Sequence, residues 1–336
     1  MTRLVKLWLL VIAFLLMFSL PSFAATSPQM TVAFIPGAAG LGDMSFNDMM
    51  YGGLRKAQVE YGFKLIISDQ GPGGVYDEEK FAKTIEQSDV LVLLGAQFKE
   101  VARTKAKLYP EKYWILFEYP IDDIPNLSCV MFAQNEGSYQ AGALAASMSQ
   151  TNKIGFLGGT KILPVESFQL GYIEGAKHVN PEIEIVSTFV SPPGDFLGFT
   201  KPDTGFDIAQ QMYDNGIDVI FAVAGLTGNG AIECARQRKK FIIGVDSNQD
   251  AMAKGYVLTS MIKRLDVATY NEVSKIMEKK FKSGITYYGL ESGGVSLSDF
   301  EFTKDIIPPA VFKMLDETKT KIISGEIVVP DSFPNK

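Results

Sequence analysis

The sequence predicts an α/β protein of two lobes, each a parallel sheet flanked by helices, with a ligand cleft between them. Three observations support this fold class. The chain has 336 residues and 46% hydrophobic content, which is more than one ordinary core needs. Short apolar runs alternate with helical patterns, as in parallel sheets covered on both faces. The alternation occurs twice without a Pro/Ser-rich or charged linker, which is typical of hinged domains.

The two rounds of strand–helix alternation, called the first and second pass below, contain the following expected strands and helices. The expected strands are the apolar runs at residues 30–35, 63–68, 90–94, 113–117, 127–132, 154–157, 183–190, 219–223, 241–245 and 256–261. The expected helices are an amphipathic segment beginning at Asp48 and the patterns at 78–87, 136–149, 168–179, 207–215, 230–237 and 267–282.

The division into lobes follows from a boundary near residues 132–134. We expect residues 25–133 and 264–300 to form the N-terminal lobe, because the segment after the strand at 256–261 can return to the first pass. Residues 134–263 and 301–336 would form the C-terminal lobe. The chain would then cross between the lobes several times.

The first 24 residues have the pattern of a signal peptide. Arg3 and Lys6 precede an apolar run at 7–20, and Ser22 and Ala24 occupy the −3 and −1 positions of a cleavage site. The run is shorter than the roughly 20 residues of a spanning helix. We therefore expect cleavage after Ala24 and a soluble protein exported to the periplasm. Because no cysteine lies near the cleavage site, we do not expect a lipid anchor on the new N-terminus.

The net charge and the two cysteines bear on whether the protein binds nucleic acid and whether it contains a disulfide bond. The formal charge of −6 becomes −8 once Arg3 and Lys6 are removed, which argues against nucleic acid as a partner. Cys129 and Cys234 could pair in an oxidising compartment. Their separate apolar contexts favour two buried thiols instead.

The usual catalytic sets are missing from the sequence. The single histidine, His178, stands at the expected end of a helix, where a solvated or dipole-stabilised role is ordinary. Ser-His-Asp, Cys-His and zinc arrangements are therefore excluded, and neither a metal nor a cofactor is expected. Asp122 and Asp123 could be general acids, but Pro120 and Pro125 favour an exposed turn.

The turn after the first strand is the leading candidate for a binding loop. Asp43, Ser45 and Asn47 offer hydrogen bonds and Phe46 offers a flat apolar face. At the carboxyl end of a strand in an open α/β sheet, such a turn lies in the crevice where small ligands bind. The pattern favours a ring with polar edges.

Strand ends in the second pass add further candidates. The glycine-rich runs at 158–161 and 222–230 lack phosphate-loop and dinucleotide spacing; the first favours a tight strand-to-helix turn. The second, containing Gly225, would let backbone N–H groups approach a ligand. Phe199 and Lys263 also follow expected strands. Asp246 could accept hydrogen bonds from vicinal hydroxyls, or it could be a helix N-cap.

Six segments in order resemble one known family. They are Asp43-Met44-Ser45-Phe46-Asn47, the run at 132–142, Gly158-Gly159-Thr160-Lys161 with the run at 171–176, the run at 224–228, Gly244-Val245-Asp246-Ser247, and the run at 257–264. Together they resemble the basic membrane protein family of substrate-binding proteins, which includes purine nucleoside receptors of ABC importers. The resemblance implies the two-lobed periplasmic-binding-protein fold of the ribose-binding-protein type (class I).

The resemblance also implies roles for particular residues. Phe46 and Phe199 would stack on the two faces of a base, a contact worth about 1–3 kcal/mol per base. Asp246 and Lys263 would hold ribose hydroxyls, with Gly225 behind the sugar. From the first lobe, Ser45 and Asn47 would reach the polar edge of the ligand, beside Asp43.

The departures from the family pattern concern the base. The nucleoside receptors carry an aspartate nine residues before the stacking phenylalanine, where this chain has Gly37. They carry another after the strand at 113–117, where this chain has Glu118 and Tyr119. Losing a carboxylate that reads N–H donors can change which base is accepted.

The leading functional hypothesis is a monomeric periplasmic binding protein that closes on a nucleoside, by resemblance a purine nucleoside. It would deliver the ligand to an ABC transporter permease in the inner membrane, with no bond made or broken. One alternative is a sensory module that reports to a membrane receptor. Another is an exported nucleoside-processing enzyme, which would need a general acid or an aspartate cluster that the sequence does not offer.

Overall fold

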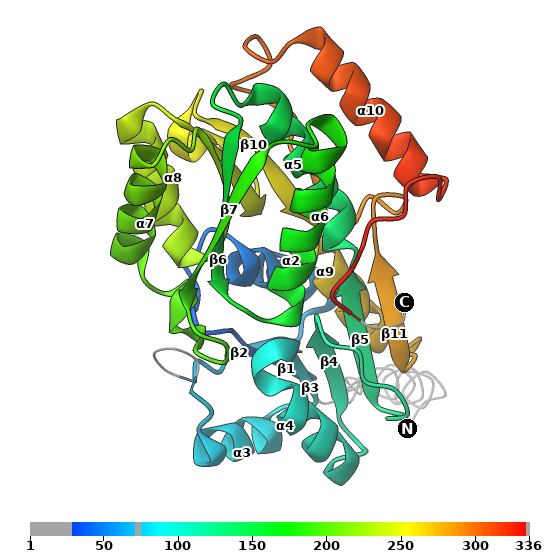
Figure 1. Ribbon diagram of the computed structural model, residues 1–336. Coiled ribbons are helices and arrows are strands. Elements are labelled where there is room, and N and C mark those ends of the chain that lie inside the picture. Colours follow the sequence, from blue (N-terminus) through cyan, green and yellow to red (C-terminus); the bar gives the residue numbers. More distant parts are fainter. Residues whose placement is uncertain (1–28, 71–74, 334–336) are drawn as a thin grey trace, which may run out of the picture.

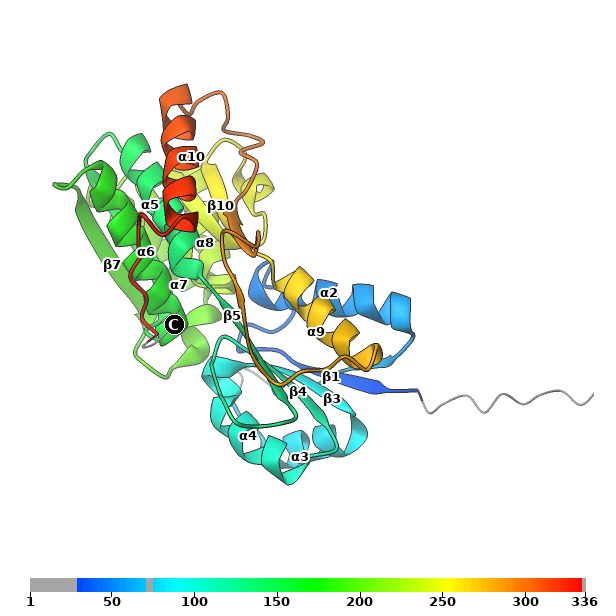
Figure 2. The ribbon, with the colours of Figure 1, turned by 90° about the vertical axis from the view of Figure 1, so that its right-hand side faces the viewer.

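The computed structural model describes residues 29–70 and 75–333, and within these ranges the chain forms two lobes. Each lobe is built on a six-stranded sheet with helices on both faces (Figures 1 and 2). The predicted α/β class with parallel-dominated sheets is therefore confirmed. The expected leader peptide and its cleavage site after Ala24 lie outside the described residues. None of the described helices combines the length and apolar character required to cross a membrane.

The first lobe contains an entirely parallel sheet. Its strand order is β11 (Gly284–Tyr288), β5 (Leu127–Phe132), β4 (Tyr113–Phe117), β3 (Val90–Leu94), β1 (Thr31–Ile35) and β2 (Lys64–Ile67). One face packs on α2 (Phe46–Tyr61) and α9 (Leu265–Met277), and the other on α3 (Glu78–Gln87) and α4 (Gly95–Leu108). β3 and β4 are buried on both faces, which explains their uninterrupted apolar sequences.

The second lobe repeats this plan with one antiparallel edge. Its strand order is β12 (Val295–Leu297), β10 (Val257–Lys263), β9 (Phe241–Asp246), β8 (Val219–Val223), β6 (Lys153–Thr160) and β7 (Glu184–Ser191), with β12 antiparallel to β10. Its helices are α5 (Gln134–Met148), α6 (Leu163–Val179), α7 (Pro202–Asp214), α8 (Leu226–Arg238) and α10 (Pro309–Ile323), with the short turns η2 (Phe196–Phe199) and η3 (Asp250–Ala253).

The chain passes between the lobes after β5, after β10 and between β11 and β12. The last crossing differs from the expected return after residue 300, because β12 already pairs with β10 at 295–297. The sequence analysis did not identify β11, β12, α4 or α10. β12 has only three residues, too few to show a period, and α4 begins directly at the end of β3 without a turn signal.

The two cysteines are buried in the protein core, and the histidine lies near an aromatic ring at the end of a helix. Cys129 lies in β5 and Cys234 in α8, both as buried free thiols in different lobes. Burial raises the pKa of each thiol to about 11, which suits inert core residues. His178 lies in the last turn of α6 with its ring centroid 5.7 Å from that of Tyr139.

Candidate functional site

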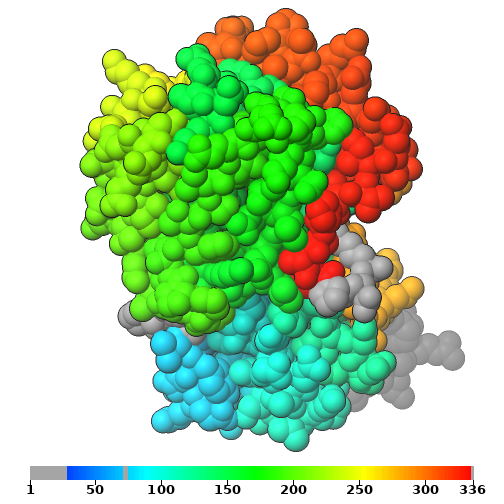
Figure 3. Space-filling model, viewed as in Figure 1, coloured from blue at the N-terminus to red at the C-terminus, as the bar shows by residue number. Residues whose placement is uncertain are grey.

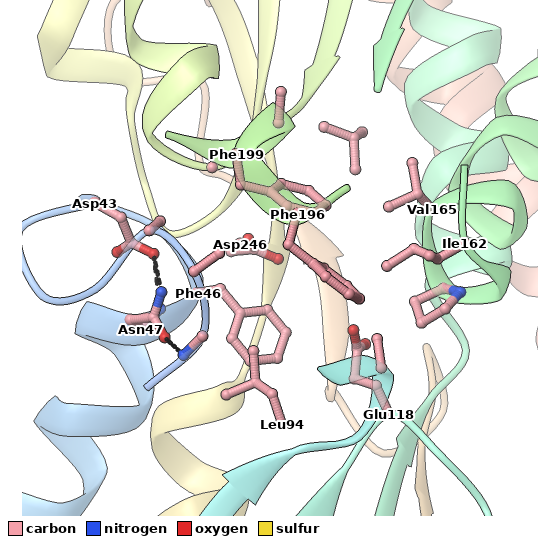
Figure 4. A pocket seen from close by; sticks show the side chains of 18 of the residues that line it. Asp43, Phe46, Asn47, Leu94, Glu118, Ile162, Val165, Phe196, Phe199 and Asp246 are labelled. Carbon is pink, nitrogen blue, oxygen red and sulfur yellow. Dashed lines mark hydrogen bonds between the residues drawn. The ribbon is translucent and has the colours of Figure 1, made fainter. Parts of the chain in front are cut away.

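A cavity lies between the lobes at the carboxyl ends of the parallel strands, where α/β folds bind ligands. It holds about 730 Å³, including the part open to solvent. Figure 4 shows side chains from both lobes pointing into it. The lining residues are Gly37, Ala38, Ala39, Asp43, Phe46, Asn47, Leu94, Gly95, Ala96, Gln97, Glu118, Ile162, Pro164, Val165, Phe168, Phe196, Phe199, Val223, Ala224, Gly225, Val245, Asp246 and Lys263.

The turn after β1 is held by its own side chains. Asp43 accepts hydrogen bonds from the backbone N–H groups of Ser45, Asn47 and Asp48 and from Asn47 Nδ2, at 2.8–3.2 Å. Asn47 Oδ1 in turn accepts from Gly37 N at 2.8 Å (Figure 4). Burial raises the pKa of Asp43, whereas these hydrogen bonds lower it. Asp43 and Asn47 therefore line the cavity but organise the start of α2.

Phe46 is the residue of this turn that offers the ligand an apolar surface. It is the first residue of α2, and its ring points into the cavity (Figure 4). The adjacent Ser45 is fully buried and does not line the cavity. The turn thus presents one ring and few uncommitted polar groups.

Phe199 lies across the cavity from Phe46, on η2 of the second lobe. Gly159 makes room for it, since a Cβ there would lie 2.4 Å from the Phe199 ring. The pair Gly158-Gly159 lies inside β6, so the expected strand-to-helix turn at this position is wrong. Gly225, with φ of +54°, backs the same ring. The glycines accommodate aromatic packing.

Two further phenylalanines, which were not singled out from the sequence, also line the cavity. Phe196 shares η2 with Phe199, and Phe168 lies on α6. The sequence signal that could have identified Phe196 is its spacing of three residues from Phe199, because residues three apart in a 3-10 turn lie on the same side.

Asp246 ends β9 with a left-handed backbone, φ +64°. Its Oδ2 accepts a hydrogen bond from Ser45 Oγ at 2.6 Å, which joins the two lobes. Burial raises the pKa of Asp246 to about 7; the charge of Asp43 acts in the same direction and the Ser45 hydrogen bond opposes both. Asp246 is not the N-cap of η3, because that position belongs to Gln249.

Lys263 and Glu118 form an ion pair between the lobes. Lys263 ends β10 with a fully buried side chain, and its Nζ lies 5.0–5.3 Å from the ring centroids of Phe46, Phe132 and Phe168. Burial lowers the pKa of Lys263, and the contact with the Glu118 carboxylate favours the charged form. Glu118 has a left-handed backbone, φ +66°.

Tyr119 does not line the cavity, although sequence reasoning placed it beside Glu118 in the site. Its hydroxyl accepts a hydrogen bond from Lys99 Nζ at 2.8 Å, and its ring faces Phe333. The reason is the left-handed backbone of Glu118, which follows the end of β4 and turns the chain, so that the neighbouring side chains do not share one side.

The position of Gly37 is crowded by the ends of two flexible side chains. A Cβ there would lie 2.7 Å from Leu94 Cδ2 and 3.0 Å from Gln97 Oε1. Gln97 Oε1 also accepts from Ala38 N at 2.9 Å. Leu94 and Gln97, neither of which the sequence analysis singled out, therefore lie where the side chain of an aspartate at residue 37 would begin, and both would have to shift to admit it.

The rim of the cavity carries more contacts between the lobes. Met44 O accepts hydrogen bonds from Ser247 Oγ at 2.5 Å and from Gln249 Nε2 at 3.2 Å. Asn229 Nδ2 donates to Asp43 O at 3.0 Å. The lobes are therefore in the closed arrangement. In the part of the chain that the structure describes, no cluster of acidic, histidine and cysteine side chains could hold a metal ion.

Comparisons with known proteins extend over nearly the whole described chain. A family model described as Bmp, ABC transporter substrate-binding protein PnrA-like, matches residues 30–332. Basic membrane protein A of Borreliella burgdorferi is 33% identical, with 86% of this chain and 85% of that protein covered. The ABC transporter nucleoside-binding protein BmpA of Lactococcus lactis is 31% identical, with 90% and 89% covered.

A solved structure supports the same relationship. An ABC transporter solute-binding protein from Aeropyrum pernix superimposes with a TM-score of 0.81 at 27% identity, covering 90% of this chain and 94% of that one. The agreement extends over both lobes.

Proposed function

Because the chain belongs to the Bmp family of PnrA-like ABC transporter substrate-binding proteins, we propose that it closes its lobes on a nucleoside and delivers it to an importer permease. The family consists of substrate-binding proteins, so this chain is a binding protein and not an enzyme. One relative is named a nucleoside-binding protein. Export to the periplasm and action as a monomer belong to the same proposal.

The observation that carries the nucleoside assignment is the pairing of aromatic rings with a buried carboxylate in one cavity. Phe46 comes from the first lobe, and Phe199 and Asp246 come from the second. A base between the rings would gain about 1–3 kcal/mol per stacking contact. The carboxylate of Asp246 would accept hydrogen bonds from ribose hydroxyls.

The charge of the cavity supports a nucleoside over a nucleotide. Among the described lining residues, Lys263 is the only one with a positively charged side chain, and Glu118 already pairs with it. Asp43 and Asp246 add two more carboxyl groups to the lining, and burial raises the pKa of both. A phosphate group would meet repulsion here, whereas hydroxyl donors would be stabilised.

The end of the cavity next to Gly37, where the base would lie, differs from that of nucleoside receptors that carry an aspartate at the position of Gly37. We therefore expect this chain to recognise the base in a different way. Leu94 and Gln97 crowd the position of Gly37, and Glu118 is held by Lys263. We propose a purine as the base, with its polar edge read at this end of the cavity.

A thermal-shift screen tests the assignment with purine nucleosides, pyrimidine nucleosides, free bases and ribose. A ligand at 100 times its dissociation constant stabilises the folded state by about 2.7 kcal/mol, which gives a clear rise in Tm. We expect purine nucleosides to give the largest rise and Phe46→Ala to remove most of it. Stabilisation by ribose or free bases alone, with none from any nucleoside, would show that the assignment is wrong.

A further inference from the structure

The C-terminal segment after α10 returns along the molecule to the groove between the lobes. Figure 1 shows it (red) running down past α5 and α6, and Figure 3 shows it on the surface reaching the boundary with the first lobe. Asn135 Nδ2 donates to the carbonyl oxygens of Val329 and Pro330, at 3.0 and 3.2 Å. Ser332 Oγ donates to Leu163 O at 2.5 Å. The segment is therefore fixed to the second lobe up to residue 332.

Residue 333 then contacts the first lobe. The Phe333 side chain is buried, and its ring meets Tyr119 edge to face, with centroids 6.2 Å apart and planes at 80°. Tyr119 also contacts Lys99, whose Nζ lies 4.1 Å from the ring centroid, and its Cβ lies close to the backbone of Gly95. Phe333 thus completes the packing around Tyr119.

These contacts flank the ligand cavity on both lobes. Leu163, held by Ser332, lies between the lining residues Ile162 and Pro164. Tyr119, held by Phe333, directly follows Glu118. Glu118 has a left-handed backbone, which a non-glycine residue keeps only when its surroundings enforce it.

We propose that Phe333 is a positioning residue of the ligand site, acting through Tyr119 to hold Glu118 against Lys263 in the closed form. The segment 329–333 then works as a strap that joins the lobes beside the cavity. This inference rests on the proposed function only for the identity of the ligand. The contact itself can be tested without any ligand.

The ligand-free test is hydrogen exchange at the Glu118 amide, which donates to Val130 O at 2.8 Å. We expect faster exchange in Phe333→Ala and native exchange in Phe333→Tyr, which keeps an aromatic ring. Val328→Ala is the matched control, because Val328 directly precedes the strap and is 84% exposed. Native exchange at Glu118 in Phe333→Ala would overturn the proposal whatever the ligand is.

The second test measures the Kd of inosine by calorimetry. Phe333→Ala should raise Kd about 2- to 10-fold, as expected for one edge-to-face aromatic pair, with no change in Val328→Ala. In a Glu118→Gln background the same substitution should add little, because its effect passes through Glu118. Equal losses in both backgrounds, or an unchanged Kd beside faster exchange, would overturn the positioning role. If no nucleoside binds wild type while Glu118 exchange responds as expected, the ligand assignment fails and the strap remains supported.

Discussion

The turns after β1 and β9 meet across the cavity, and each brings a buried aspartate to it. Asp43 accepts several hydrogen bonds, all from residues of its own turn and the start of α2. Asp246 accepts one from Ser45, on the opposite lobe. The two aspartates therefore have different surroundings.

The difference indicates which carboxylate can recognise a ligand. A carboxylate whose lone pairs are filled by backbone N–H groups stabilises a helix start and has little capacity left. A carboxylate that is buried with few donors keeps that capacity and has a raised pKa, as Asp246 has. In the proposed site, Asp43 shapes the turn and Asp246 binds the sugar.

The largest expected effect is on affinity, in Asp246→Ala. Above a pH of about 7, where Asp246 is ionised, two hydrogen bonds from hydroxyls to its carboxylate, each worth about 1.5–3 kcal/mol, correspond to at least a hundredfold loss of nucleoside affinity. Calorimetric titration measures the loss, with the Tm of the unliganded variant as the control for folding. Binding within about threefold of wild type would remove Asp246 from the site.

The second expected effect is on stability, in Asp43→Ala. The substitution leaves buried N–H groups at the start of α2 without an acceptor, which should lower the free energy of unfolding by about 2–3 kcal/mol. Urea denaturation measures this change. A variant that unfolds like wild type but has lost nucleoside binding would reverse the roles assigned to the two aspartates.

The third expected effect is a pH dependence of stability that comes from Asp246. Its folded-state pKa of about 7 lies above the ordinary value of 3.8, so the folded state binds the proton more tightly. This contribution to stability is complete below pH 3.8 and is lost as pH rises through about 7. The Tm of wild type should therefore fall relative to Asp246→Asn across this window. Parallel Tm profiles for the two proteins would contradict the raised pKa.

The sequence predicted the central strands of both sheets well because these strands are buried on both faces. The bounds of β3, β4 and β8 match the apolar runs 90–94, 113–117 and 219–223. It predicted the cavity-lining positions of Asp43, Phe46, Asn47, Glu118, Phe199, Gly225, Asp246 and Lys263 through strand ends and the family motifs. Their roles in ligand binding stay predictions.

Sequence reasoning could not separate residues that line the cavity from residues beside it. Ser45 and Tyr119 are neighbours of lining residues but point elsewhere, and only the backbone path decides this. Leu94, Gln97 and Phe196 carry no motif of their own. They reach the cavity because the end of β3, the start of α4 and η2 are placed beside it by the rest of the fold.

By itself, the sequence determined the α/β class, the repeated pass and the family, because burial on sheets and local turn chemistry leave patterns along the chain. The tertiary structure decided which polar groups are already satisfied, since hydrogen bonds such as Ser45–Asp246 and the Lys263–Glu118 ion pair join residues far apart in sequence. It also decided that Phe333 meets Tyr119. Recognition depends on which groups remain available after folding, and that follows from contacts between the lobes.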